Sequence, residues 1–308
     1  MMSDQKRVVV TGATGLIGRP LCAHLCERGY AVTIFSRSTD KARQTLPGMA
    51  DYVAWQAEEH GAWERAIDGA HAVINLAGAS LFSKRWTEKY KRVLWDSRVV
   101  GTRGLVNAMR AASARPAVFI SGSAVGYYGA RDDTVLPEEA APGNDFLAKL
   151  CVAWEQEAFK AKQLGVRVAT IRTGIVLDAN EGALPLMKLP FTFFAGGYIL
   201  PGTQWFPWIH IADEVGIILK TLDDADVRGP VNASAPHPQT NADFMRTLGR
   251  VMGRPAWVPV PGFALRLALG AFADSLTTGQ RAIPENITEH GYTFKYPTSE
   301  AALRDLLG

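Results

Sequence analysis

The sequence predicts an α/β protein with a doubly wound parallel sheet, the Rossmann fold, and a smaller, irregular C-terminal domain. Short apolar runs alternate with longer helical patterns through the first half of the chain, which is typical of βαβ units. A glycine-rich turn joins the first such run to the first helical pattern. Beyond about Leu177, glycine, proline and aromatic residues replace this alternation. We therefore predict one domain over residues 1–177 and a second over 178–308, from which some strands and helices return to the first.

The individual elements follow from the spacing of apolar residues. Strands are predicted at Val8–Val10, Ala31–Phe35, Ala72–Leu76, Ala117–Ile120 and Arg167–Ile171. Helices are predicted at Arg19–Arg28, Glu88–Ala112, Asp145–Leu164, Asn241–Met252 and Gly262–Ala273. A further helix is expected near Glu214, with Asp213 as its N-cap. Loops and a hairpin are expected over Gly182–Pro207, and a short strand and a final helix from His290 to Leu307.

Composition excludes several classes of function. The 308 residues are 47% hydrophobic, which is enough for a large core, and 33 Lys and Arg balance 30 Asp and Glu. This balance indicates neither a nucleic-acid nor a membrane partner. Three cysteines without a C-x-x-C pair argue against a disulfide framework and against a zinc site, and no other feature of the sequence indicates a metal. No signal peptide or transmembrane-length run is present, so we expect a cytoplasmic protein with a small-molecule substrate and leave its oligomeric state open.

The segment from Arg7 to Gly18, RVVVTGATGLIG, carries the first functional motif. A strand, a G-x-x-G-x-x-G turn and a helix in this order let backbone N–H groups approach a pyrophosphate at the helix N-terminus. The alternative is an ordinary turn between a strand and a helix. The predicted cofactor contacts in this turn are Gly12, Thr14, Gly15, Leu16, Ile17 and Gly18.

The end of the second strand predicts which dinucleotide binds. Ser36 and Arg37 lie about where a dinucleotide fold reaches the adenosine ribose. An acidic residue there would repel a 2′-phosphate, whereas a guanidinium and a hydroxyl suit one. A solvated basic loop, which also contains Lys41 and Arg43, is the alternative. We predict NADP(H) as the cofactor of residues 1–177.

Two further strand ends are predicted to meet at the same edge of the sheet. The first ends in the small-residue turn Leu76, Ala77 and Gly78, which either touches the cofactor or is ordinary turn chemistry. The next helix places Arg98 in an apolar stripe. A guanidinium in such a stripe either faces the cofactor, or it extends to solvent or pairs with a carboxylate such as Asp96 or a distant glutamate.

The second strand end carries the candidates for chemistry. The segment Phe119–Gly129, FISGSAVGYYG, places polar side chains at the sheet edge, although it would also suit a plain serine- and glycine-rich turn. A hydroxyl there can hold a substrate oxygen, and a tyrosine can act as an acid. Cys151, one helical turn after Leu147, is either reactive or a structural thiol. The candidates are Ser123, Tyr127, Tyr128 and Cys151 for catalysis, and Ser121 and Gly122 for the cofactor.

These motifs together resemble the extended short-chain dehydrogenase/reductase superfamily. The match runs through TGATGLIG, NLAG, SRVVGTR, SGSAVGYYG, RTGIVL and WIHIADE in order. The segments FFAGG, GTQWFPWIH and GYTFKYP resemble an atypical branch, often labelled NAD(P)-dependent epimerase/dehydratase or cell-division inhibitor. The resemblance supports Ser36, Arg37, Leu76, Ala77 and Arg98 as cofactor contacts, adds Ile175 beside the nicotinamide, and implies that His210 is mainly structural.

The departures from the superfamily concern the catalytic residues. Ser123 matches the superfamily serine, but the tyrosine position falls on Leu147, the lysine position on Cys151 and the asparagine position on Arg98. Leucine cannot donate a proton, so any redox step needs another acid. Two hypotheses follow: an NADP(H)-dependent oxidoreductase or epimerase-like enzyme for a small carbonyl or sugar-like substrate, and a non-catalytic NADP(H)-binding redox sensor or interaction protein.

Overall fold

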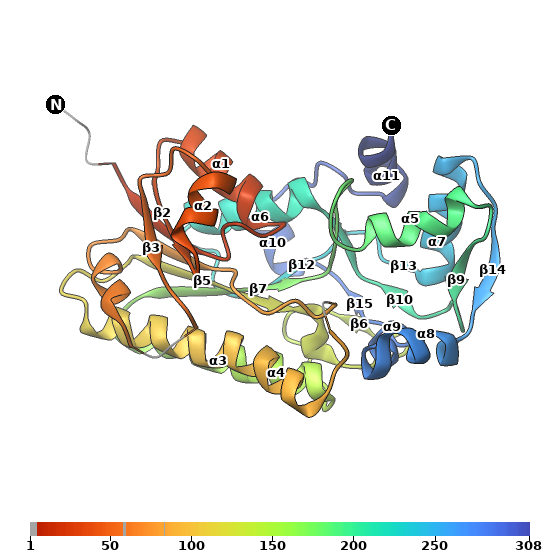
Figure 1. Cartoon of the computed structure of the whole chain (residues 1–308), viewed down its shortest axis with the longest axis horizontal. Coiled ribbons are helices and arrows are strands. Elements are labelled where there is room, and N and C mark those ends of the chain that lie inside the picture. The colour runs from red at the N-terminus through yellow and green to blue at the C-terminus, as the bar shows by residue number, and fades with distance from the viewer. Residues whose placement is uncertain (1–4, 58–59, 83) are drawn as a thin grey trace.

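The computed structural model describes residues 5–57, 60–82 and 84–308. Its described part contains a sheet of seven strands in the order β12-β7-β5-β4-β1-β2-β3, in which every neighbouring pair is parallel (Figure 1). The strands are β1 Arg7–Thr11, β2 Ala31–Ser36, β3 Asp51–Ala54, β4 Ala72–Asn75, β5 Val118–Ala124, β7 Arg167–Thr173 and β12 Gly229–Ala233. This order confirms the predicted doubly wound α/β fold.

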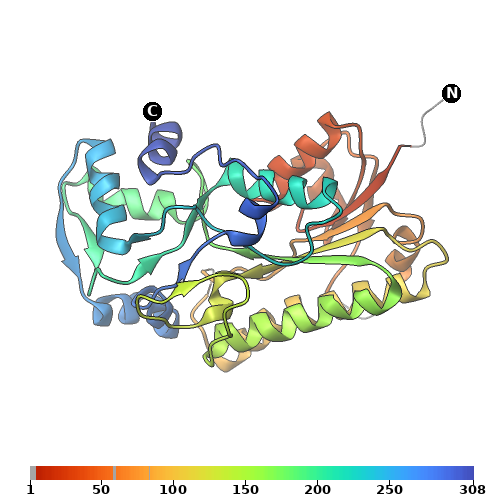
Figure 2. The ribbon, with the colours of Figure 1, turned by 180° about the vertical axis from the view of Figure 1, so that it is seen from behind.

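Helices cover both faces of the sheet, as Figures 1 and 2 show. Helices α1 (Gly18–Glu27) and α6 (Ile211–Asp223) pack on one face, and α3 (Glu88–Ala111) and α4 (Phe146–Phe159) pack on the other. Side chains alternate along β1: Val8 and Val10 join the core under α1 and α6, and Val9 joins the core under α3. A strand buried on both sides therefore reads as an unbroken apolar run.

The predicted strands and helices of the first half are confirmed, and the structure also contains elements that were not predicted. The predicted helix Asp145–Leu164 consists of α4 followed by the 3₁₀ segment η3, Lys160–Leu164. Strands β3 and β12, which form the two edges of the sheet, were not predicted. β12 lies well beyond residue 177 and pairs with β7, so the later part of the chain completes the first sheet.

The hairpin predicted over Gly182–Pro207 is wrong. The segment forms helix α5 (Leu184–Thr192) and strands β9 (Gly196–Ile199) and β10 (Trp205–Phe206). β9 pairs in parallel with β14 (Ala256–Val260), and β10 pairs with β13 (Gln239–Thr240). The helix has Pro185 in its first turn, where no intrahelical N–H bond is lost, and it also contains Pro190 in its interior, so the prolines misled the prediction.

The remaining elements build the C-terminal half. Helix α7 (Asn241–Met252) has the predicted bounds, and the predicted helix Gly262–Ala273 is α8 (Gly262–Leu269), the 3₁₀ segment η4 (Gly270–Phe272) and α9 (Ala273–Leu276). The last helices are α10 (Glu285–Glu289) and α11 (Ser299–Leu307). The strand expected between them is not observed. Two short pairs link distant segments: β8 (Ile175–Leu177) with β11 (Trp208–His210), and β6 (Val135–Leu136) with β15 (Arg281–Ala282).

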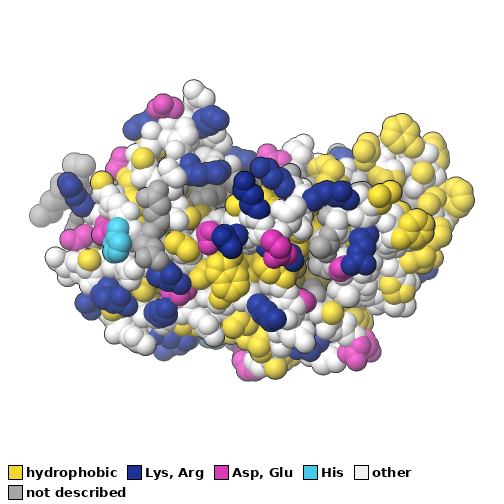
Figure 3. Space-filling view, turned by 60° about the horizontal axis from the view of Figure 1, so that its bottom comes forward, with side chains coloured by type: hydrophobic (Ala, Val, Ile, Leu, Met, Phe, Trp, Pro, Cys, Tyr) yellow, Lys and Arg dark blue, Asp and Glu magenta, His cyan; other side chains and the backbone are white. Residues whose placement is uncertain are grey.

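The surface of the C-terminal half is rich in exposed apolar side chains, which gather at the right end of the molecule in Figure 3. Those around α5, β9 and β14 are Leu186, Leu189, Phe193, Phe194 and Trp257. Among the described residues, no helix combines the length and hydropathy needed to cross a bilayer.

Candidate functional site

The glycine turn is fixed by close backbone approaches. Gly12 has φ +68°, and a Cβ on it would lie 2.7 Å from the Leu76 carbonyl, so only glycine fits where β1 meets the end of β4. A Cβ on Gly18 would collide with the Gly12 carbonyl oxygen. A Cβ on Gly15 would lie 3.2 Å from the Gly12 carbonyl oxygen, and the Gly15 N–H donates to the same carbonyl. The turn is therefore rigid and leads directly into α1, as a pyrophosphate cradle requires.

The segment after β8 covers this turn. A Cβ on Gly182 would lie 3.1 Å from Leu16 Cδ2, which places the segment against the glycine turn. Arg19 donates to the Thr14 carbonyl at 3.0 Å and pairs with Glu181 at 2.7 Å. The two halves of the chain thus meet over the turn that contains Thr14, Leu16 and Ile17.

The end of β2 presents a free cation. Ser36 Oγ accepts from the Ser38 N–H at 3.3 Å, and Ser38 caps helix α2 (Thr39–Thr45). Arg37 is exposed and has no hydrogen bond or ion pair among the described residues. Arg43, in contrast, lies over the Tyr52 ring at 4.4 Å. Arg37 is therefore the guanidinium available to an anion beside Ser36.

The ends of β4 and α3 lie close together at the carboxyl edge of the sheet. The N–H groups of Leu76 and Ala77 donate to the backbone and side-chain oxygens of Thr11, and a Cβ on Gly78 would lie 2.8 Å from Arg98 Cζ. Arg98 donates to the Leu94 carbonyl at 3.3 Å and lies 5.3 Å from the Trp154 ring, with no carboxylate partner in the described part of the chain. Pairing with Asp96 is not observed. A partly buried, unpaired guanidinium at this edge suits an anionic ligand.

Ser123 is part of a buried ionic network. Its hydroxyl donates to Glu155 Oε1 at 2.6 Å. Arg172 binds the same carboxylate through two nitrogens, at 2.8 and 2.9 Å. Glu155 and Arg172 are 4% and 2% exposed, so this pair is shielded from water. Because the single Ser123 proton is used on Glu155, Ser123 presents a lone pair to any ligand.

The two tyrosines differ in access. Tyr128 is fully buried; its hydroxyl donates to Asn232 Oδ1 at 2.7 Å and accepts from Arg172 at 2.9 Å. Burial raises the pKa of Tyr128 to about 12, so it holds its proton. Tyr127 is partly buried, and its ring lies 3.5 Å from Arg172 Cζ. Its hydroxyl has no hydrogen-bond partner among the described residues, so Tyr127 is the better placed acid.

Cys151 is buried beside the network. Burial, with the charge of Glu155, raises the pKa of the thiol to about 12, although the Arg98 charge opposes this. Such a thiol is protonated at neutral pH and supplies no thiolate. This environment favours a structural thiol that packs against Ser123. The catalytic assignment of Cys151 stays a prediction.

The other predicted cofactor contacts lie near the same edge. Ser121 is fully buried, with Asn75 Nδ2 at 3.5 Å from its hydroxyl, and its assignment as a cofactor contact stays a prediction. A Cβ on Gly122 would lie 2.9 Å from the Trp154 ring, so close packing against this ring accounts for a glycine at this position. Ile175 begins β8 and is partly buried.

Glu155 and Arg172 are the residues of this site that the sequence analysis missed. Glu155 follows Cys151 by four residues and therefore lies on the same face of α4 as Leu147 and Cys151. A carboxylate on a helix face that is otherwise apolar was the available signal. Arg172 lies within the RTGIVL motif, in β7 directly beside β5.

The segment around His210 is structural. Helix α6 begins at Ile211, and His210 Nδ1 accepts from the Ala212 N–H at 3.0 Å, so the expected N-cap function of Asp213 is wrong. Asp213 is buried and instead accepts from the N–H groups of Lys295 and Tyr296. It thereby ties the C-terminal segment to α6.

The His210 cap predicts a pH dependence of stability. Burial lowers the pKa of His210, despite Asp305 at 3.2 Å from Nε2. Since the folded pKa lies below the unfolded value, this contribution is complete above about pH 6.5 and is lost as the pH falls through the folded pKa. We expect the wild type to lose stability relative to His210→Asn, which keeps a capping oxygen, between pH 7 and pH 5 in urea titrations. Parallel curves for the two proteins would contradict this.

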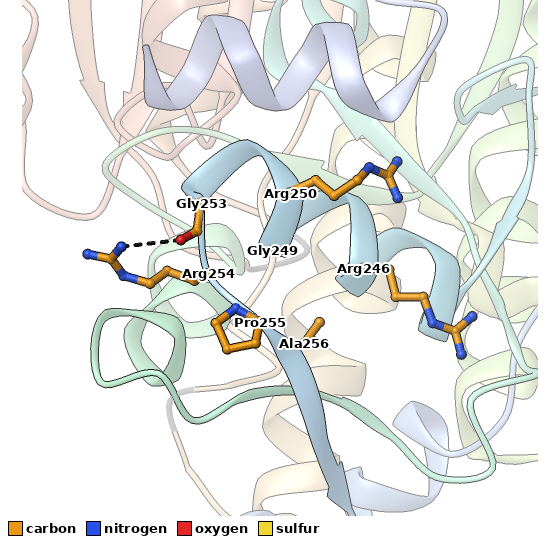
Figure 4. Close-up of a pocket in the computed structure, with 7 residues that line it drawn as sticks. All are labelled: Arg246, Gly249, Arg250, Gly253, Arg254, Pro255 and Ala256. Atoms are coloured by element: carbon orange, nitrogen blue, oxygen red, sulfur yellow. Dashed lines mark hydrogen bonds between the residues drawn. The ribbon is translucent and has the colours of Figure 1, made fainter.

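A separate hollow lies on the C-terminal half, lined by Arg246, Gly249, Arg250, Gly253, Arg254, Pro255 and Ala256 (Figure 4). The side chain of Arg254 points away from those of Arg246 and Arg250, and it donates to the Gly253 carbonyl at 3.2 Å. None of the predicted site residues lines this hollow.

Comparison with known proteins shows the family and the fold that the chain resembles. The model of the NAD dependent epimerase/dehydratase family matches residues 8–233, and a domain of unknown function, DUF1731, matches residues 260–306. The chain is 40% identical to the Arabidopsis thaliana epimerase family protein SDR39U1 homolog, chloroplastic, over 99% of this chain and 87% of that protein. It is 38% identical to the Bacillus subtilis epimerase family protein YfhF, over 97% of each. Among solved structures, human epimerase family protein SDR39U1 (isoform 2) with NADPH has a TM-score of 0.85 and 32% identity, covering 97% of this chain and 98% of that chain.

Proposed function

From the premise that this chain belongs to the NAD dependent epimerase/dehydratase family, we propose that it is an NADP(H)-dependent oxidoreductase or epimerase-like enzyme for a small carbonyl or sugar-like substrate. The observation that supports this cofactor is the exposed guanidinium of Arg37 at the end of β2, which has no partner in the described part of the chain. Its fork suits a 2′-phosphate, with Ser36 beside it. The NADPH in the human relative supports the same choice.

Backbone groups and one further arginine are the other contacts that we propose for this cofactor. The turn Gly12–Gly18 and the start of α1 would hold the pyrophosphate, and the backbone at Leu76–Gly78 would line the path to the nicotinamide. When bound, the nicotinamide supplies hydride transfer. Arg98, unpaired beside Gly78, would bind negative charge on the cofactor or the substrate.

The protein groups around the reacting centre define the substrate end. Ser123, whose proton goes to Glu155, would accept a hydrogen bond from a substrate hydroxyl and so orient it. Tyr127, whose hydroxyl has no hydrogen-bond partner among the described residues, would supply or take the proton. Ser123 and Tyr127 would thus take over the function of the superfamily tyrosine and lysine, whose positions are occupied by Leu147 and Cys151 in this chain.

The test is binding followed by turnover. Purified protein is titrated with NADPH, NADH, NADP⁺ and NAD⁺, and its NADPH complex is mixed in single-turnover experiments with a panel of carbonyl compounds that also carry a hydroxyl group, which can donate to Ser123. We expect oxidation of bound NADPH by at least one compound, with a rate about 10²-fold lower in Ser123→Ala. Unchanged NADPH affinity in this variant would show that the substitution slows the chemical step and does not weaken cofactor binding. A rate equal to that of the wild type would remove Ser123 from the mechanism.

The second candidate is a non-catalytic NADP(H)-binding sensor or interaction protein. The protonated, buried Cys151 and the missing tyrosine–lysine pair favour it. Tight and selective NADPH binding without oxidation by any compound of the panel would support this candidate. Absence of dinucleotide binding would contradict both.

A further inference from the structure

The end of the C-terminal half that α5, β9 and β14 form carries large apolar side chains in contact with solvent (Figures 1 and 3). Leu186, Leu189 and Phe193 are three and four residues apart, so they project from one face of α5. Phe194 follows in the next turn, and Trp257 of β14 donates its indole N–H to the Phe194 carbonyl at 3.0 Å. These five side chains are between 55% and 75% exposed, and we call them the apolar surface.

The segments that build this end of the molecule contain cations but no acidic residue. Residues 184–204 and 244–273, which include α5, β9, β14 and α8, have no Asp or Glu. Their cations are Lys188, Arg246, Arg250, Arg254 and Arg266. Arg254 lies over the Phe194 ring at 4.3 Å, and neither Arg254 nor Arg250 has a carboxylate partner in the described part of the chain. The balanced charge of the whole chain, from which we expect no membrane partner, therefore hides a local excess of positive charge beside the apolar surface.

Phe194 is a residue that the fold alone does not explain. It has φ +59° and is the one non-glycine residue with a positive φ among the described residues. This conformation favours glycine and is unfavourable for a bulky side chain. The Phe194 side chain is 56% exposed, so burial in the protein does not compensate for the strain. A strained residue that packing does not require is typical of a functional position.

We propose that the apolar surface docks on the face of a lipid bilayer that contains anionic lipids. Its leucine and phenylalanine side chains would enter the boundary between headgroups and acyl chains, where tryptophan is also favoured. Arg250 and Arg254 would bind the anionic headgroups, and the charge complementarity of these arginines is the reason for choosing anionic lipids. Docking of this kind needs no helix that crosses the bilayer.

Charge and shape favour a bilayer over a second copy of the chain. A symmetric contact between two copies of this surface would bring two sets of arginines without carboxylate partners together, which is unfavourable. The apolar side chains project from a helix face, a turn and a strand at one end of the long axis of the molecule (Figure 1). A bilayer accepts such projections without a complementary groove. The proposal does not depend on the proposed reaction.

The test is sedimentation of the full-length protein with vesicles of phosphatidylcholine alone and of equal parts phosphatidylcholine and phosphatidylglycerol. We expect the wild type to bind the mixed vesicles more tightly, and less so as ionic strength rises. The double variant Leu186→Ser/Phe193→Ser should lower the partition coefficient about 10-fold or more, since two apolar side chains no longer enter the interface. Val93→Ser, at an exposed valine of α3 in the dinucleotide half, is the matched control and should bind as the wild type does. Thermal melts by circular dichroism check that each variant folds, and Leu189→Ser replaces the double variant if that one does not.

Arg250→Gln tests the electrostatic part of the proposal. It should weaken binding to the mixed vesicles about fivefold and leave binding to phosphatidylcholine vesicles unchanged. Arg228→Gln, at an exposed arginine before β12, is the matched control. No binding of the wild type to the mixed vesicles would overturn the proposal, as would equal affinity for the two kinds of vesicle or equal binding by the double variant and Val93→Ser. Sedimentation velocity without lipid covers the other occupants: a dimer that the double variant loses would assign the surface to a second copy, and a monomer that binds no vesicles would assign it to another protein. Both results would contradict docking on a bilayer.

Discussion

Replacing Glu155 with leucine is expected to lower the free energy of unfolding by about 3–5 kcal/mol, the largest loss of stability that we predict. The substitution leaves the Arg172 guanidinium, 2% exposed, without its carboxylate and removes the acceptor of the Ser123 hydroxyl. A buried charge without a partner is far more destabilising than the loss of the pair as a whole. Urea unfolding monitored by tryptophan fluorescence measures the change.

The double variant Glu155→Leu/Arg172→Leu separates the two explanations. If the loss comes from the stranded charge, the double variant should recover much of the stability of the single variant. The exposed pair of Glu300 and Arg304, joined by two hydrogen bonds, is the matched control, and Glu300→Gln should change stability far less. A small effect of Glu155→Leu would mean that Arg172 finds another partner, and that the network does not hold Ser123 in place.

Local patterns made the dinucleotide half of the fold predictable. The order of strand, glycine turn and helix at Arg7–Gly18 needs no distant contact to be recognised, and the structure has it at that place. Helix α7 has its predicted bounds because Thr240 caps its start and Gly253, with φ +62°, ends it. The family resemblance, carried by motifs along nearly the whole chain, is likewise confirmed by the family model and the relatives.

Contacts between distant segments were not predictable from one sequence. Strand β9 pairs with β14, whose first residue, Ala256, lies opposite Gly196, and nothing in either segment names its partner. The Glu155–Arg172 ion pair was missed for the same reason: the carboxylate on the apolar face of α4 signals a buried partner, but nothing in either segment identifies which residue that partner is. Only the fold shows that α4 turns Glu155 toward β7.

The cofactor preference gives the second large effect. Arg37→Ala is expected to weaken NADPH binding by about 10-fold or more and to leave NADH binding nearly unchanged. The reason is that Arg37 has no protein partner in the described structure, so its guanidinium is available to the 2′-phosphate, which NADH lacks. Because the side chain is exposed, the effect should shrink as ionic strength rises. Fluorescence titration with both dinucleotides at two salt concentrations measures it.

Arg43→Ala is the matched control for this prediction. It removes a nearby guanidinium of the same charge, but one that lies over the Tyr52 ring, so it should change NADPH affinity much less than Arg37→Ala. Equal losses in the two variants would indicate a general effect of positive charge on a dianionic ligand. A selective loss in Arg37→Ala requires a specific contact at the end of β2. Unchanged selectivity in Arg37→Ala would place the 2′-phosphate elsewhere and leave the choice between NADPH and NADH to the backbone of Ser36–Ser38.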